Sequence, residues 1–192
     1  FIGREPWKSA DMTAFGYMLE LARTGTGWLA PQLMGLPPNV DALLPYWLGA
    51  WAMQLAPSGV AADFAARIPF AALLVLAMLG TWYATYYLAR SPLAQPVAFA
   101  FGGEALPTDY AGATAEGGFR AQLSHETSPA LAQLGFAALF YYGMAALPHR
   151  HVGPMVAVVS GLIGLSLSGA PSLALLFGLG ATALHYFDRA RD

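Results

Sequence analysis

The chain contains no cysteine, which excludes disulfides, thiolate metal ligands and sulfur nucleophiles. Charge is also scarce, since 10% of the residues are charged, against about 25% in an ordinary soluble domain. The nine Lys and Arg residues are scattered and the net charge is −2, which excludes the clustered basic surface that binds nucleic acid. No glycine-rich phosphate loop stands between a strand and a helix. So few charges could not cover a water-facing surface.

A long apolar run is what the chain does have. Hydrophobic residues make up 57% of the sequence, and residues 68–89, IPFAALLVLAMLGTWYATYYLA, carry no charge between Arg67 and Arg90. Roughly 20 apolar residues in a helix match a hydrocarbon core of roughly 30 Å. The second half of the run is rich in Trp and Tyr, which favour the membrane–water boundary. The run therefore predicts a transmembrane helix.

The predicted fold class is an all-α integral membrane protein, in which interfacial amphipathic helices precede about four transmembrane helices. Residues 1–67 are mixed in polarity and are predicted to lie at the water boundary. Residues 68–89 form the first span. Residues 90–127 are polar and glycine-rich, which predicts a loop. Residues 128–192 are predicted to form a three-helix transmembrane region.

Two amphipathic helices are predicted in the first region, at residues 12–22 and 40–56. The first carries an apolar stripe at helical spacing, formed by Phe15, Met18, Leu19 and Ala22. Asn39 is a plausible N-cap for the second helix. Trp47 and Trp51 lie one turn apart on it, either at headgroup level or in the core.

Three further spans are predicted at residues 129–147, 152–168 and 172–187. Ser128 can cap the first of them, ahead of a proline at the first helical position. Four spans that alternate in direction would put both termini on one side of the membrane. Arg67 and Arg150 would then share a side, opposite Arg90.

Small residues repeat every four positions in the third span, at Ser160, Gly164 and Ser168. Such a stripe lets a second helix approach closely. It also arises by chance in glycine-rich apolar sequence, so both interpretations stay open.

Asp11 is the candidate catalytic residue. It follows Arg4 and Lys8 in the segment GREPWKSADM. A carboxylate beside cations at a membrane surface could take the proton of an attacking hydroxyl or amine while a phosphate departs. The alternative is structural, with Asp11 as the N-cap of a helix that begins at Met12. The histidines predict no metal site, because its ligands would have to come from different loops.

Short phrases along the chain resemble a family of membrane enzymes. They are PWKSAD at 6–11, LARTGTGWLAPQLMGLPP at 21–38, YWLGAWA at 46–52, FAFGGEALPTDYA at 99–111 and AQLSHETSPALAQL at 121–134. Together they resemble the N-terminal part of the polytopic bacterial glycosyltransferases of the aminoarabinose-transferase and protein-mannosyltransferase type, the GT-C class. The order of the phrases is the same as in that family.

The resemblance implies a site and a location. Asp11 would be the acid that the first extracytoplasmic loop presents to a polyprenyl-phosphate sugar donor, with a divalent metal as the cofactor of an active form. The acceptor would be lipid A or protein. Residues 1–67 would lie on the periplasmic side of the bacterial inner membrane.

The departures from the family pattern indicate that this chain does not transfer sugar. Met12 follows Asp11 where the family has a second acid, and Asp41 lies in the stretch where the family has a phosphate-binding lysine. An aspartate there would repel a phosphate. The family's first span and its later spans are also missing. We therefore expect a fragment or a shortened, inactive relative that contacts membrane lipid. The first alternative is a structural accessory subunit bound to other membrane subunits. The second, less favoured alternative is a pigment- or lipid-binding subunit.

Overall fold

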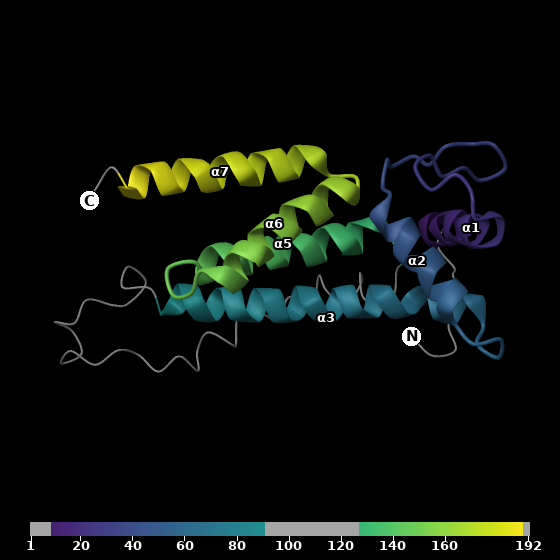
Figure 1. The fold of residues 1–192 in the computed structure, drawn as a ribbon, viewed down its shortest axis with the longest axis horizontal. Coiled ribbons are helices and arrows are strands. Elements are labelled where there is room, and N and C mark those ends of the chain that lie inside the picture. Colours follow the sequence, from purple (N-terminus) through teal and green to yellow (C-terminus); the bar gives the residue numbers. More distant parts are fainter. Residues whose placement is uncertain (1–8, 91–126, 190–192) are drawn as a thin grey trace.

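The structure, a computed structural model, describes residues 9–90 and 127–189 (Figure 1). These residues form six helices and no β-strand: α1 (Ser9–Thr24), α2 (Leu44–Leu55), α3 (Ala62–Ala89), α5 (Pro129–Ala146), α6 (Val152–Leu167) and α7 (Pro171–Arg189). The predicted all-α class is thus confirmed for the described residues. In Figure 1, α1 and α2 gather at one end of α3, which we call the head end, and the opposite end is the tail end. The predicted loop at 90–127 lies outside the described residues apart from its two ends.

The buried face of α1 is formed by Ala14, Tyr17, Met18 and Leu21, which are three and four residues apart. The predicted stripe was right in part: Met18 is buried, and Phe15 and Ala22 are half-buried against the same core. The predicted stripe did not include Tyr17, whose ring packs 5.3 Å from the ring of Tyr46 on α2. The helix ends before Gly25, whose φ of 64° suits a residue without a Cβ.

The second helix begins at Leu44, four residues later than residue 40, where it was predicted to begin. Asn39 does not cap it; the N-cap position is held by Leu43, which makes no side-chain cap bond. The backbone N–H of Leu43 instead donates to the carbonyl of Leu167 at 2.8 Å. This bond ties the segment before α2 to the end of α6, and so delays the start of the helix.

The third helix is the longest of the described helices. It begins at Ala62 rather than at residue 68, and Arg67, the predicted boundary, lies inside it with 6% of its surface exposed. Its 28 residues span about 42 Å at about 1.5 Å per residue. It is the one helix of the described part that is long and apolar enough to cross a membrane, whereas α6 and α7 are shorter apolar helices. The four predicted spans are therefore not established by helix length.

α3 and α5 run in the same direction. Gly135 packs on Leu73 near the head end and Gly80 packs on Ala138 further along, so residue numbers rise together on both helices. Both helices therefore lead from the head end to the tail end, as Figure 1 shows. This differs from the predicted alternation, since Arg90 and Arg150 both lie at the tail end. The sequence could not show the arrangement, because periodicity says nothing of which helices pair.

α6 returns toward the head end, packed against α5 through glycines. A Cβ on Gly161 would lie 2.9 Å from the backbone nitrogen of Phe140, and one on Gly143 would lie 2.8 Å from the carbonyl oxygen of Pro154. The two backbones are thus too close for any side chain at these points. The chain then turns at Gly169, with φ of 82°, and α7 leads back to the tail end.

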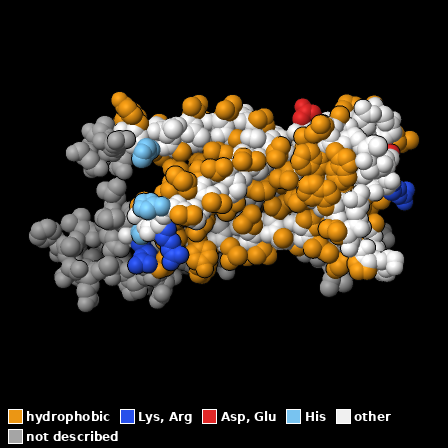
Figure 2. Space-filling view, in the orientation of Figure 1, with side chains coloured by type: hydrophobic (Ala, Val, Ile, Leu, Met, Phe, Trp, Pro, Cys, Tyr) orange, Lys and Arg blue, Asp and Glu red, His pale blue; other side chains and the backbone are white. Residues whose placement is uncertain are grey.

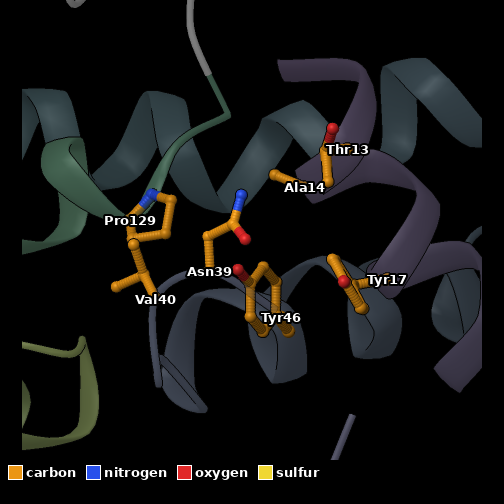
Figure 3. Close-up of a pocket in the computed structure, with 7 residues that line it drawn as sticks. All are labelled: Thr13, Ala14, Tyr17, Asn39, Val40, Tyr46 and Pro129. Carbon is orange, nitrogen blue, oxygen red and sulfur yellow. The ribbon is translucent and has the colours of Figure 1, made fainter. Parts of the chain in front are cut away.

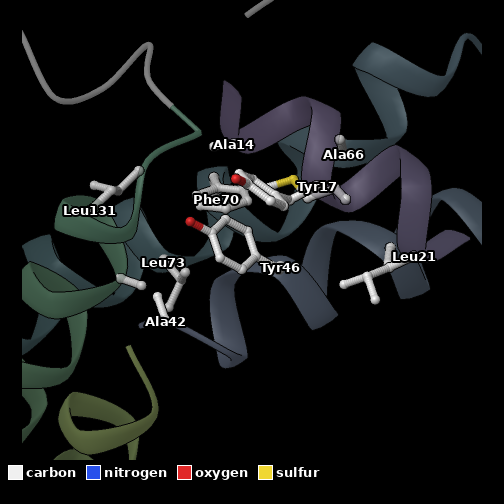
Figure 4. Packing of buried hydrophobic residues seen from close by; sticks show 12 residues of the cluster. Ala14, Tyr17, Leu21, Ala42, Tyr46, Ala66, Phe70, Leu73 and Leu131 are labelled. Carbon is white, nitrogen blue, oxygen red and sulfur yellow. The ribbon is translucent and has the colours of Figure 1, made fainter. Parts of the chain in front are cut away.

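The described core lies at the head end, where α1 and α2 meet the first half of α3 and the start of α5 (Figure 4). Met18, Phe70 and Leu131 are its largest fully buried hydrophobic side chains from α1, α3 and α5. Burying one such side chain stabilises the fold by roughly 1.5–3 kcal/mol. The core therefore fixes α1 and α2 on the end of the bundle.

The tryptophans of α2 form a cluster with Trp28 beside this core. Trp47 is half-buried and donates its indole N–H to the carbonyl of Trp28 at 2.7 Å. Trp51 is 44% exposed and stacks on the Trp28 ring at a centroid distance of 6.0 Å. Neither tryptophan is a plain core residue. Their partly exposed rings suit a boundary between apolar and wet surroundings.

Candidate functional site

Asp11 lies in the first turn of α1, and 3% of its surface is exposed. One of its carboxylate oxygens accepts hydrogen bonds from the backbone N–H of Thr127, at 2.9 Å, and from the Thr127 hydroxyl. The helix already begins at Ser9, so Asp11 is not the N-cap of a helix starting at Met12. Its carboxylate joins the first turn of α1 to the start of α5.

A cavity of about 320 Å³ opens beside this pair, between α1, α2 and the start of α5. It is lined by Thr13, Ala14, Tyr17, Asn39, Val40, Tyr46 and Pro129 (Figure 3). The two tyrosines are buried and form its inner wall, whereas Thr13 and Asn39 are exposed at its rim. The cavity thus has an aromatic interior and a polar opening.

Tyr46 is the most perturbed titratable group described. Its burial, followed by the nearby Tyr17, raises its pKa from 10.0 to about 12. The Tyr46 hydroxyl therefore stays protonated near neutral pH and serves as a hydrogen-bond donor. Tyr17 already donates its own hydroxyl to the carbonyl of Leu36 at 3.3 Å. In the described part of the chain the Tyr46 hydroxyl makes no such bond.

Among residues 9–90 and 127–189, no Lys, Arg or His lines the cavity. Two carboxylates are close by in sequence, since Asp41 follows Val40 and Asp11 precedes Thr13 by two positions. The described part of the lining therefore offers no positive charge to a phosphate. The lining instead offers hydroxyl and amide groups next to apolar surface, which is the chemistry that recognises neutral polar molecules.

The described residues do not form a metal centre around Asp11. Across residues 9–90 and 127–189, no three His, Asp or Glu side chains are close enough together to hold an ion. Asp11 and Thr127 supply one carboxylate and one hydroxyl, which is too small a ligand set for a divalent cation with octahedral or higher coordination. The divalent metal expected for an active form therefore does not fit these residues.

The predicted packing stripe has unequal members in the structure. Gly164 is buried against the ring of Phe136 on α5, and Ser168 is fully buried at the end of α6. Ser160 is half-buried, and its hydroxyl donates to the carbonyl of Val156 on its own helix at 2.7 Å. The close approach of α5 and α6 is thus made by glycines, with Gly161 beside Gly164.

Two buried hydroxyls of the head end lack a hydrogen-bond partner within the described residues, those of Ser128 and Ser168. Ser128 does occupy the N-cap position of α5, as predicted, but its side chain makes no cap bond. The backbone N–H of Leu131, three residues later, donates to the Ser128 carbonyl at 3.1 Å. The start of α5 is therefore fixed by backbone bonds and by Thr127.

Sequence reasoning missed Tyr17, Tyr46 and Thr127 as site residues. Tyr46 lies in the phrase at 46–52, but nothing in that phrase marks its hydroxyl as unpaired. Thr127 is 116 positions from Asp11, and no local spacing could pair them. The cavity that Tyr17 and Tyr46 line becomes visible only in the structure.

Comparisons with protein-family models, with curated proteins and with solved structures find no match for this chain. The class of molecule is therefore defined by the structure itself, as a helical bundle with two short helices packed on its head end. The glycosyltransferase resemblance stays a prediction.

Proposed function

We propose that this chain is an integral membrane protein whose α3, α5, α6 and α7 lie in lipid and whose head end lies at the water boundary. The observation that carries this proposal is the separation of charge. Residues 68–89, 129–147 and 152–187 contain no Asp, Glu, Lys or Arg. In Figure 2, hydrophobic side chains cover the middle of the visible face, while the charged side chains and histidines lie toward its two ends.

The exposed surface between the two ends supports lipid contact. Large apolar side chains are exposed along α3, α6 and α7, as with Val75 at 53%, Met155 at 63% and Leu179 at 70%. In water this surface would be an extended apolar patch of the kind that causes association. In a bilayer it would face hydrocarbon at no cost. The 18 and 19 residues of α5 and α7 span about 27 and 28 Å, close to the roughly 30 Å of the hydrocarbon core.

The positions of the arginines support one orientation. Among the described residues, three arginines lie at the tail end, namely Arg90, Arg150 and Arg189, and two lie at the head end, namely Arg23 on α1 and Arg67 on α3. The positive-inside tendency places the richer end in the cytoplasm. The head end would then face the periplasm of a bacterial inner membrane, as the family resemblance implies. The parallel course of α3 and α5 is what brings Arg90 and Arg150 together.

The function supported best is that of a non-transferring relative of the polyprenyl-phosphate sugar transferases. Its support is the state of Asp11, which is buried and accepts two hydrogen bonds from Thr127. A general base must reach the proton that it removes, at about 3 Å or through one water. A carboxylate that fastens α1 to α5 serves structure instead.

Two assays test this proposal. Membranes that contain the chain are washed with alkaline carbonate, and we expect the chain to stay in the pellet until detergent is added. Proteoliposomes are then supplied with a radiolabelled polyprenyl-phosphate sugar together with lipid A or an acceptor protein. We expect no transfer above that of empty liposomes. Release by carbonate would contradict the membrane assignment, and transfer that disappears in Asp11→Asn would make Asp11 catalytic.

A second candidate, an accessory subunit of a larger membrane complex, is favoured by the surface of α6 and α7. An apolar groove of about 660 Å³ runs between them, lined among others by Ile163, Leu175 and Leu179. A photoreactive amino acid at Leu179 would crosslink to a partner subunit in cell membranes, with the same label at Ser58 as control. A crosslink to protein at Leu179 alone favours the accessory role, and crosslinks to lipid alone argue against it.

A further inference from the structure

We propose that the tail end of the bundle binds the phosphate of an anionic phospholipid, with Arg90 and Arg150 as the charged groups that hold it. Two histidines, His149 and His151, lie beside Arg150 where α5 turns into α6. We call these four residues the tail-end basic cluster. The inference rests on the proposed membrane assignment, and it adds the class of lipid that this end selects.

A ring contact brings the cluster together from two segments of the chain. The His149 ring packs on the Tyr87 ring of α3 at a centroid distance of 5.1 Å. Arg90 follows Tyr87 by three positions, which is the spacing of neighbours on a helix. Arg150 directly follows His149 in the turn. The two arginines therefore flank one pair of rings, and Figure 2 shows basic side chains and histidines gathered at this end.

The cluster is held in place while its charged groups face solvent. Arg90 lies over the Tyr86 ring, 5.2 Å from its centroid, and donates one N–H to the Tyr86 hydroxyl at 2.6 Å. A guanidinium carries five N–H donors, of which this bond uses one. In the turn, the backbone N–H groups of His149 and Arg150 both donate to the Ala146 carbonyl, at 2.9 and 3.0 Å. Both arginines are exposed, so a phosphate can reach them without any opening of the fold.

Negative charge is scarce at the tail end of the described residues. Four of the described acids lie at the head end, namely Asp11, Glu20, Asp41 and Asp63. α5 and α6 contain no acid, and α7 ends on Asp188 and Arg189, whose formal charges offset each other. The amine of a zwitterionic headgroup would therefore gain little here. A headgroup that carries a phosphate and no amine matches the charge of the two arginines.

The surface next to the cluster suits a lipid rather than a soluble phosphate. Val75, Leu79, Tyr83, Tyr86 and Arg90 are three or four positions apart and so share one face of α3. The first three of them are exposed by 53%, 51% and 48%. The face is about 22 Å long, which exceeds the roughly 15 Å of one half of the hydrocarbon core. An acyl chain can thus lie along the apolar part of this face while its phosphate meets Arg90, and the tyrosines mark the headgroup level.

The test titrates the whole, delipidated chain in mild detergent with phosphatidylglycerol and with phosphatidylethanolamine of the same acyl chains, and native mass spectrometry counts the bound lipid. We expect phosphatidylglycerol to bind at least tenfold more tightly. Arg90→Gln and Arg150→Gln should each weaken its binding about fivefold and leave phosphatidylethanolamine unaffected. Arg23→Gln removes an exposed charge at the head end; it is the matched control and should change neither affinity. Arg150→Lys keeps the charge and should keep most of the affinity.

Three results would overturn the inference. They are equal binding of the two lipids, a loss in Arg23→Gln as large as in Arg150→Gln, and a loss in Arg150→Lys as large as in Arg150→Gln. Glycerol phosphate, the soluble headgroup, distinguishes the two sources of phosphate. It should not displace phosphatidylglycerol at equal concentration, and displacement would assign the cluster to a soluble anion instead. A chain that stays in carbonate-washed membranes but shows no lipid preference would remove this inference alone, whereas release by carbonate would remove the membrane assignment.

Discussion

Thr127 donates both its backbone N–H and its hydroxyl to one carboxylate oxygen of Asp11, across 116 positions of sequence. The two residues are 3% exposed each, so water does not compete for these bonds. Hydrogen bonds to a charged acceptor are about twice as strong as neutral ones. This pair therefore fixes α1 on the start of α5.

Replacing Asp11 should destabilise the chain, because its carboxylate accepts two hydrogen bonds from Thr127. Asp11→Ala leaves the buried N–H of Thr127 without an acceptor, which we expect to lower the free energy of unfolding by about 2 kcal/mol. Thermal unfolding in detergent measures the loss. Thr127→Ser retains both donors and is the control, expected to behave like the unaltered chain. An Asp11→Ala variant as stable as the Thr127→Ser variant would contradict this structural role.

Tyr46 should lose its hydroxyl proton at a higher pH than an exposed tyrosine. The folded chain should therefore become less stable as the pH rises through the alkaline range. Its pKa of about 12 in the folded chain lies above the value of 10.0 for an exposed tyrosine. Between these two values the unfolded chain loses the proton and the folded chain keeps it, so stability falls as pH rises from 10 to 12. Below pH 10 the contribution is fully present. Ultraviolet absorbance of phenolate, compared between the unaltered chain and Tyr46→Phe, isolates this group, and a Tyr46 that titrates near 10 would refute its burial.

Glycines on α6 should differ sharply in their tolerance of a methyl group. A Cβ at Gly161 would lie 2.9 Å from the Phe140 nitrogen and 3.0 Å from the Phe136 oxygen, both backbone atoms of α5. Gly161→Ala must push the helices apart, at a cost of about 1–3 kcal/mol. Gly153, on the same helix, has no heavy atom within 4 Å of such a Cβ. Gly153→Ala should be neutral or slightly stabilising, and equal effects at both positions in a detergent unfolding assay would rule out this packing.

Local patterns predicted the helices well, because helix formation depends on neighbours in sequence. The predicted helices at 129–147 and 152–168 match α5 and α6 to within one residue at each end. Pro148 and the glycine-proline turn at 169–171 end the helices by steric rules that any sequence obeys. The start of α2 was missed because a bond from Leu43 to Leu167, far away in sequence, decides it.

The site was harder to predict, because its relationships are between distant segments. Asp11 was predicted either as a catalytic residue or as an N-cap, and neither interpretation included its partner Thr127, which lies 116 positions away in sequence. Burial of Tyr46 depends on α1 packing over α2, and the predicted stripe of α1 did not include Tyr17, which packs on Tyr46. The direction of α5 likewise depends on which surface of α3 its glycines fit, and hydropathy does not encode that choice.

The most direct test of the account is the side of the membrane on which each end of the bundle lies. Because the chain has no cysteine, single cysteines can be introduced without background. Ser58→Cys at the head end, and Arg90→Cys and His151→Cys at the tail end, are all exposed positions. A membrane-impermeant maleimide added to intact spheroplasts should label Ser58→Cys and spare both others until the membrane is opened. Labelling of Arg90→Cys and His151→Cys from opposite sides would contradict the parallel course of α3 and α5, and labelling of all three from outside would contradict a membrane-spanning bundle.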